Sequence, residues 1–373
     1  MKINLFSLPV LSALENVYIR LKIKYRGDIK WRYPDRPKIL YVVKRLDDCG
    51  GVETRLLQYA DELTRRRYNI AFVTESNSFA GVKKYPCLHL NFHTRKFEDT
   101  LLAMMAQNGI DTVELQIKNR SCLYRLNPQR MRRHARYGCC IHSNIKGLDP
   151  EMLNDMDYRV IISDRLWHID YEAIDTFHVL PVSIAAGQRC WQWQGQSRAL
   201  IISRIRHDKY RQIESFVNYC RAVGTDFRIG GSLDSSGTVR RLKKQLGLKK
   251  EHFIGRIDNT VDYLTRHAGE YAFVAGVGQV ILEAGSLGYP CFVCSELGTG
   301  FSTFVTRRNL CDDFGRNFTL AKRKRAERIK KVSVFRPETA EDYDISGFIT
   351  EKYGLAKRFD VYEKLINKSY RNK

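Results

Sequence analysis

Short apolar runs alternate with helical patterns along most of this chain, and that alternation limits the fold more than any other feature. The first clear run, Lys38–Val43, is followed by a turn with two glycines, a helical pattern over 52–65 and a second apolar run over 69–73. Runs that are apolar throughout are typical of strands buried on both faces of a parallel sheet, and parallel strands need helical crossovers. The sequence therefore predicts an α/β protein.

The alternation forms two series, separated by a stretch over 183–197 that is rich in glycine, glutamine and tryptophan and has no strong period. Further strands are expected over 112–116, 138–141, 158–163 and 177–180, and then over 199–203, 227–229, 252–254 and 271–274. Helices are expected over 97–108 and, with many arginines, over 127–137. Because 373 residues suffice for two cores, we expect domains over 1–185 and 186–345, followed by a helical segment over 346–373.

A glycine-rich stretch in the second series is a candidate anion site. Gly276 and Gly278 separate an apolar run from a short helical pattern. Glycine lets the backbone pass close to a ligand, and a helix N-terminus presents unpaired N–H groups to an anion. Glu283 lies about five residues into that helix, roughly 7–8 Å along its axis, within reach of a group attached to a bound phosphate. The alternative is an ordinary strand–turn–helix unit.

Two further loops follow predicted strands, where an open parallel sheet binds its ligands. Arg204 and Lys209 lie in the loop after the strand over 199–203. Arginine can bind phosphate through two hydrogen bonds and lysine supplies a point charge, although such a loop is commonly just solvated. His142 follows the strand over 138–141, and the alternative for it is a histidine satisfied by loop backbone.

The charge of the chain favours polyanionic partners. Lysine and arginine number 63 against 41 aspartates and glutamates, a net charge of +22. Such a field attracts nucleic acid, anionic lipid or phosphorylated ligands. No nucleic-acid-binding module or set of stacking aromatics accompanies the charge, so nucleic acid is not expected. An apolar stripe over 11–21 and a basic block over 322–331 could each contact an anionic membrane, or be a packed helix and a solvated block.

Two compositional features bear on location. The ten cysteines show no paired framework, which suits a reducing cytoplasm. No apolar run approaches 18 residues, so no transmembrane helix is expected. The sequence therefore predicts a cytoplasmic protein.

Taken together, the order and spacing of these pieces resemble the retaining glycosyltransferases of the GT-B fold, in the large family-four-like group, over roughly residues 38–300. Gly50 and Gly51 resemble the glycine loop after that fold's first strand. His142 resembles the active-site histidine, and Arg204 with Lys209 resembles the pair that holds the diphosphate. On the nucleotide side, the turn that meets the base is matched by Arg256 and Ile257. The helix start is matched by Gly276, Gly278, Gln279 and Val280, and the ribose-binding glutamate by Glu283.

The resemblance implies two Rossmann-like domains that face one another across a cleft, with the C-terminal segment returning to the N-terminal domain. It implies transfer of a sugar from a nucleotide-sugar donor to a lipid-linked or surface glycan, as in lipopolysaccharide or capsule synthesis, with retention of configuration. His142, Arg204 and Lys209 would be catalytic, and the glycines and nucleotide-side residues would bind the donor. No metal or other cofactor is expected. The enzyme would be cytoplasmic and peripheral at the inner face of an anionic membrane.

Three departures from the family pattern keep other functions open. Ala275 stands where the family has a first glutamate, the usual Asn-Gly is missing after Pro181, and Glu114 and Gln116 occupy a strand end where histidines are frequent. The alternatives are a nucleotide-sugar 2-epimerase on the same fold and a non-catalytic protein that binds polyanions or membranes.

Overall fold

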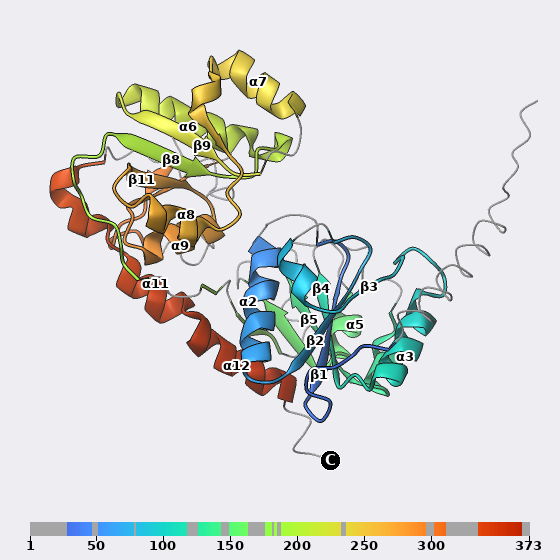
Figure 1. Ribbon diagram of the computed structural model, residues 1–373. Helices are drawn as coiled ribbons and strands as arrows, with labels where there is room; N and C mark the ends of the chain where they lie inside the picture. The colour runs from blue at the N-terminus through green and yellow to red at the C-terminus, as the bar shows by residue number, and fades with distance from the viewer. Residues whose placement is uncertain are drawn as a thin grey trace, which may run out of the picture. The chain divides into compact units, whose positions relative to one another are not determined.

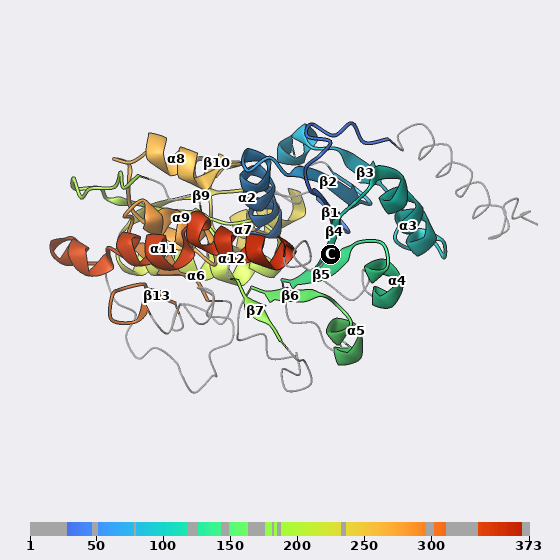
Figure 2. The same ribbon diagram turned by 90° about the horizontal axis from the view of Figure 1, so that it is seen from below.

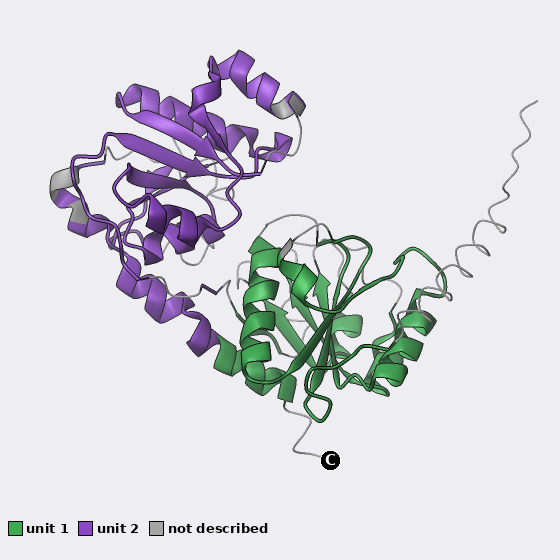
Figure 3. Ribbon diagram, viewed as in Figure 1, with its two compact units in different colours: residues 1–180, 359–373 green, residues 181–358 purple. Residues whose placement is uncertain are grey.

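The structure is a computed structural model of the chain. It describes residues 28–46, 51–77, 80–117, 126–142, 149–162, 176–180, 183–184, 188–232, 236–295, 302–310 and 335–367. The chain divides into two compact α/β units, one formed by 1–180 with 359–373 and the other by 181–358 (Figure 3). The sequence-based boundaries are 185/186 and 345/346, against 180/181 and 358/359 in the structure. The two-domain α/β fold predicted from the sequence is confirmed.

Unit 1 is built on a parallel sheet with the strand order β3-β2-β1-β4-β5-β6-β7. The strands are β1 (Lys38–Val43), β2 (Asn69–Thr74), β3 (Cys87–His89), β4 (Thr112–Ile117), β5 (Arg136–Ile141), β6 (Tyr158–Ile161) and β7 (His178–Val179). The central strands β1, β4 and β5 are almost wholly buried because helices cover both faces.

The two faces of this sheet differ in chemistry. Helices α3 (Phe97–Asn108), α4 (Pro128–Arg132) and α5 (Pro150–Asn154) cover an apolar face, to which Val113 and Leu115 contribute (Figures 1 and 2). Helices α2 (Gly51–Arg65) and α12 (Leu355–Asn367) lie side by side on the other face. Because side chains alternate along a strand, Glu114 and Gln116 point to this second face, where both are fully buried.

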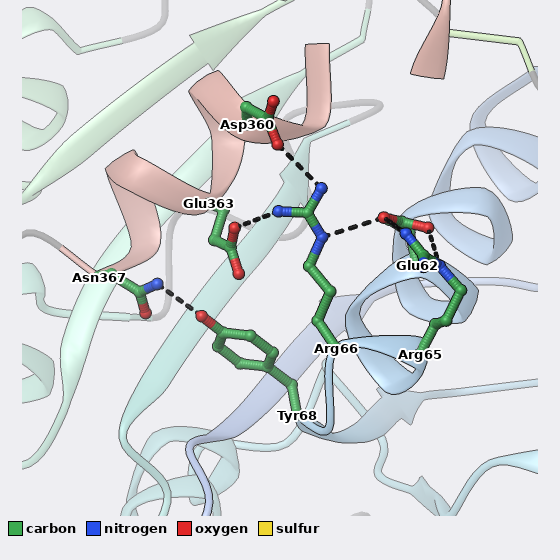
Figure 4. A network of polar contacts seen from close by, with 7 residues as sticks. All are labelled: Glu62, Arg65, Arg66, Tyr68, Asp360, Glu363 and Asn367. Carbon is green, nitrogen blue, oxygen red and sulfur yellow. Dashed lines mark hydrogen bonds and ion pairs between the residues drawn. The ribbon is translucent and has the colours of Figure 1, made fainter. Parts of the chain in front are cut away.

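Ion pairs hold α12 against α2. Arg66, just after α2, donates to Glu62 at 3.0 Å and to Asp360 of α12 at 2.8 Å, and it also pairs with Glu363 (Figure 4). Its guanidinium lies over the ring of Phe359, 4.5 Å from the centroid. These contacts fix the end of the chain to the N-terminal unit.

The predicted helix over 127–137 is wrong in its extent. Asn127 caps α4 by accepting from the N–H groups of the next turn, and Pro128 occupies the first helical position. The helix nevertheless ends at Arg132, and Arg136 already pairs with Thr112 in the sheet. Pairing with β4 therefore overrides the local helical pattern in the second half of the segment.

Unit 2 contains a sheet with the strand order β10-β9-β8-β11-β12-β13, parallel except for β13. The strands are β8 (Arg198–Ile202), β9 (Asp226–Gly230), β10 (Phe253–Gly255), β11 (Tyr271–Gly276), β12 (Cys291–Val293) and β13 (Thr303–Phe304). Helices α6 (Tyr210–Ala222) and α7 (Ser236–Leu246) pack on one face, and α8 (Thr260–Arg266), α9 (Gln279–Ser286) and α11 (Ser346–Tyr353) pack on the other (Figure 1). Short 3₁₀ turns lie at Ala80–Lys84, His207–Lys209, Lys250–His252 and Pro337–Tyr343.

The glycine-, glutamine- and tryptophan-rich stretch packs into unit 2 at Trp191. The indole is 3% exposed, and its N–H donates to the carbonyl of Tyr271 at 3.0 Å. None of the helices in the described ranges is both long enough and apolar enough to cross a membrane.

Candidate functional site

The carboxyl ends of β8 and β11 lie side by side in the centre of the unit 2 sheet. After β8 the chain passes to α6 on one face, and after β11 it passes to α9 on the opposite face. The strand order reverses at this point, and the two loops diverge. Open α/β sheets bind their ligands at such a reversal, outside the carboxyl ends of the strands. Arg204 and Gly276–Gly278 are therefore brought to one edge, as the sequence predicted.

Glycine is required where backbones approach one another at this edge. Gly231, after β9, has φ +133, and a Cβ there would lie 2.0 Å from the carbonyl oxygen of Ser203. At Gly276 a Cβ would lie 2.8 Å from Cγ1 of Val280. The first turn of α9 therefore packs directly on the strand end, which places its N-terminus at the edge of the sheet.

The start of α9 offers backbone donors. Gly278 is its N-cap residue, and the N–H of Ile281 makes a 3.1 Å hydrogen bond to the Gly278 carbonyl. The N–H groups of Gln279 and Val280 precede this first bond, so helix geometry provides no carbonyl for them. Val280 turns its side chain toward Gly276 and can offer a ligand only its backbone. An anion at this helix start would meet N–H groups and the positive end of the helix dipole.

Glu283 and Gln279 form a pair one turn apart on α9. Nε2 of Gln279 donates to Oε1 of Glu283 at 2.8 Å. Glu283 is 8% exposed, and this burial raises the pKa of its carboxyl, while hydrogen bonds from Gln279 and Thr260 oppose the rise. The carbonyl oxygen of the Gln279 side chain is buried and has no donor among the described residues. Two acceptor groups therefore lie together, and one of them lacks a hydrogen bond.

The two predicted cations occupy different positions in the loop after β8. Arg204 lies two residues past the strand, is partly buried, and forms no side-chain hydrogen bond or ion pair with any described residue. Lys209 ends the turn His207–Lys209 and immediately precedes α6. Arg206, between them in the sequence, is oriented toward Asp208, with Nε 3.4 Å from Oδ1. The two arginines of this loop thus differ, because Arg206 has a carboxylate partner within the loop and Arg204 has none among the described residues.

Two predicted donor-binding residues make structural contacts of their own. Arg256 is exposed, and its Nε donates to Asp258 at 2.5 Å. Ile257 packs over the end of β9, where a Cβ at Gly230 would lie 2.5 Å from its Cδ1. Ala275, at the position of the family's first glutamate, is fully buried in the cluster beneath α6.

The remaining predicted residues belong to unit 1. His142 follows β5, is 8% exposed, and has Nε2 2.7 Å from Oε1 of Gln116. Gly51 is the exposed first residue of α2, and Gly50 lies outside the described residues. The sequence did not indicate that Thr260 hydrogen-bonds to Glu283 or that Gln116 contacts His142, because the partners in each pair are distant along the chain.

The comparisons with known proteins identify the fold. No protein-family model matches the sequence, and no curated protein matches it. A glycosyltransferase from Rickettsia africae is similar in structure, with TM-score 0.61 and 13% identity over 91% of this chain and 100% of that one. The lipopolysaccharide outer core galactosyltransferase WaaB has TM-score 0.57 and 14% identity over 89% and 99%. Anabaena HepE, solved with UDP and glucose, has TM-score 0.57 and 13% identity over 89% and 100%. The chain therefore has the GT-B fold of these glycosyltransferases.

Proposed function

We propose that this protein is a glycosyltransferase that takes a sugar from a nucleotide-sugar donor, with the donor nucleotide bound at the carboxyl edge of the unit 2 sheet. The observation that carries the proposal is the Gln279–Glu283 pair at the start of α9. It places an unpaired buried acceptor beside a carboxylate at the strand-order reversal. A buried acceptor without a donor is costly, so a ligand hydroxyl that supplies one is favoured.

The pair suits the two adjacent hydroxyls of a ribose. Both hydroxyls would donate, one to the Glu283 carboxylate and the other to the side-chain carbonyl of Gln279. A diphosphate attached to that ribose would lie toward the helix N-terminus, where the N–H groups of Gln279 and Val280 are available. The structural neighbour HepE was solved with UDP and glucose, which supports a nucleotide-sugar donor.

Charge develops on the diphosphate as the sugar leaves. Arg204 and Lys209, in the loop after β8, would stabilise that charge together with the helix N-terminus. Donors that are in place before the reaction lower the barrier without reorganisation. His142 would contact the transferred sugar or nearby reacting groups, and the reaction would retain the anomeric configuration without a metal. These last roles rest on the sequence resemblance.

The acceptor is proposed to be a glycan or glycolipid at a membrane surface, as in lipopolysaccharide or capsule synthesis. The net charge of +22 would hold the enzyme at the anionic inner face of the membrane, close to a lipid-linked acceptor. Neither nucleic acid nor a cofactor takes part in the proposed reaction.

A donor screen tests the proposal. Thermal unfolding would be followed with UDP-, GDP-, ADP- and CMP-sugars, because a ligand at a hundred times its Kd adds about 2.7 kcal/mol to stability. We expect one nucleotide class to stabilise the protein and Glu283→Gln to remove most of that effect. Glu351→Gln, which changes an exposed glutamate of α11 in the same unit, is the control.

The products then identify the reaction. Mass spectrometry should show acceptor-dependent release of the nucleotide. An altered sugar formed without any acceptor would identify a 2-epimerase. Binding of the nucleotide without turnover of any donor would identify a non-catalytic protein, and absence of binding would overturn the proposal.

A further inference from the structure

A line of polar side chains crosses the buried face of the unit 1 sheet beneath α2 and α12. The strand register places Glu114 of β4 directly between Tyr41 of β1 and Gly138 of β5, and Gly138 is in turn opposite Tyr158 of β6. Glu114 is fully buried. A carboxyl group in such a place needs strong hydrogen bonding or neutralisation, so its surroundings indicate what it does.

Hydrogen-bond donors reach Glu114 from both sides. A Cβ at Gly138 would lie 2.3 Å from the ring of Tyr158, so the glycine provides the space through which Tyr158 crosses β5. The Tyr158 hydroxyl then donates to Oε2 of Glu114 at 3.1 Å. From α12, the hydroxyl of Tyr362 also hydrogen-bonds to Glu114, and it lies 2.8 Å from the hydroxyl of Tyr41.

Both carboxyl oxygens of Glu114 accept hydrogen bonds, Oε1 from Gln116 and Oε2 from Tyr158. Burial has the largest influence and leaves the pKa of Glu114 above its ordinary value, although the charge of Arg55 and hydrogen bonds act to lower it. Arg55 is itself 1% exposed and lies over the ring of Tyr59 on α2, 4.4 Å from the centroid. The geometry thus gives Glu114 the acceptor role toward Gln116 and Tyr158, beside a buried cation.

The carboxylate determines which way the Gln116 amide points. Nε2 of Gln116 donates to Oε1 of Glu114 at 2.5 Å, so the amide turns its N–H group toward Glu114. Oε1 of Gln116 therefore faces the opposite way, toward Nε2 of His142, at 2.7 Å. An amide oxygen only accepts, so His142 must carry a proton on Nε2. In the neutral ring, Nδ1 is then the unprotonated nitrogen.

We infer that Glu114 and Gln116 are positioning residues that hold the His142 imidazole in one orientation and in the Nε2–H tautomer. The carboxylate orients the amide, and the amide orients the ring. The importance of this arrangement for catalysis rests on the proposed function, whereas the tautomer itself does not. The arrangement also links α12 to His142, since Tyr362 is one of the donors to Glu114.

The tautomer can be measured directly on the whole protein. Histidine labelled with ¹⁵N would be observed by long-range ¹H–¹⁵N correlation at pH 8, and the His142 signals would be assigned as those absent from His142→Gln. We expect wild-type His142 to be neutral with its proton on Nε2. A wild-type ring protonated on Nδ1 overturns the inference, and this measurement requires no core variant to fold.

Two variants test the relay itself, each after its fold is verified by circular dichroism. Glu114→Gln presents both an acceptor and a donor, so the Gln116 amide is no longer fixed in one orientation and both tautomers of His142 should be populated. Gln116→Met should leave a mixture of tautomers. Gln196→Met removes another buried glutamine, which hydrogen-bonds within residues 192–196 of unit 2, and should change nothing at His142. Unaltered His142 signals in both folded unit 1 variants would overturn the relay.

Kinetics separate the inference from the proposed function. Gln116→Met should lower kcat about 10- to 100-fold, as does the loss of a partner that orients a metal-bound histidine, and leave nucleotide affinity unchanged. If the tautomer changes as expected but kcat does not, positioning stands and the catalytic role of His142 is wrong. If nucleotide affinity falls equally, the variant has disturbed more than the ring.

Discussion

Tyr158 and Gly138 are neighbours across two strands of unit 1, and the tyrosine ring occupies the space that any side chain at position 138 would need. The hydroxyl beyond that ring donates to Glu114. The absence of a side chain at Gly138 thus allows the hydrogen bond between Tyr158 and Glu114 across β5.

The first prediction follows from this contact. Gly138→Ala should destabilise the protein by about 1–3 kcal/mol, the usual cost of overpacking a core, because the ring of Tyr158 must move and its hydrogen bond must lengthen. Urea unfolding followed by fluorescence gives the value. Gly347→Ala, at an α11 position with open space around it, should instead be neutral or slightly stabilising. Equal destabilisation by both substitutions would show that the contact does not matter.

Arg204 is expected to act in the reaction. Arg204→Ala should lower turnover about 100- to 1000-fold, as does the loss of one preorganised donor to a developing charge. Arg206→Ala is the matched control, since this arginine lies in the same loop but is oriented toward Asp208. Steady-state rates and nucleotide affinities of both variants are to be compared. Similar losses for the two would mean that the phosphate site has been misplaced.

The Gln279–Glu283 pair should recognise the ribose hydroxyls. Removing both hydroxyls, by using the 2′,3′-dideoxy form of the nucleotide identified in the screen, should weaken binding to the wild type. Loss of a hydrogen bond to a charged group costs about 1.5–3 kcal/mol. The Glu283→Ala variant should show a smaller penalty, because only the hydroxyl that donates to Gln279 then distinguishes the two nucleotides. Calorimetry on the two proteins with the two nucleotides measures the coupling between Glu283 and the ribose hydroxyls. A dideoxy penalty that persists undiminished in Glu283→Ala would place the ribose elsewhere.

Arg66 should control how firmly α12 is held. Arg66→Met removes its bonds to Asp360 and Glu363, so hydrogen exchange over 359–367 should become roughly five-fold faster, corresponding to about 1 kcal/mol for such a network. Arg65→Met should have no effect there, because Arg65 is exposed and, among the described residues, forms its ion pair with Glu62 alone. Added salt should narrow the difference between wild type and Arg66→Met. Equal exchange in both variants would argue that packing alone holds the helix.

The net charge of +22 predicts peripheral binding to anionic membranes. Vesicle sedimentation should show binding that requires anionic lipid and weakens as salt shortens the range of the field. Binding to neutral vesicles at high salt would instead implicate apolar insertion. The apolar stripe over 11–21 and the basic block over 322–331, to which the sequence points, lie outside the described residues.

Local pattern was enough to predict most of the elements. The buried strand Lys38–Val43 and the helix Phe97–Asn108 are found with the expected bounds, and Gly276 and Gly278 do precede a helix. Each of these features depends on residues that are neighbours along the chain. The alternation of apolar strands and helices therefore determined the α/β class and the two sheets, and the positions of loops after strands determined where Arg204 and His142 lie.

Tertiary structure decided what those residues contact. Strand pairing ended the basic helix at Arg132, and it turned Ala275 into the core beneath α6. Glu114 meets Tyr158 and Tyr362 only because register and helix packing bring distant segments together. Hydrogen bonds of this kind depend on the register between strands and on helix docking, which the periodicity of a single segment does not encode. The chain by itself thus determined which chemical groups stand at the strand ends, whereas the packing of the sheets and helices decided the orientation and the hydrogen-bond partners of those groups.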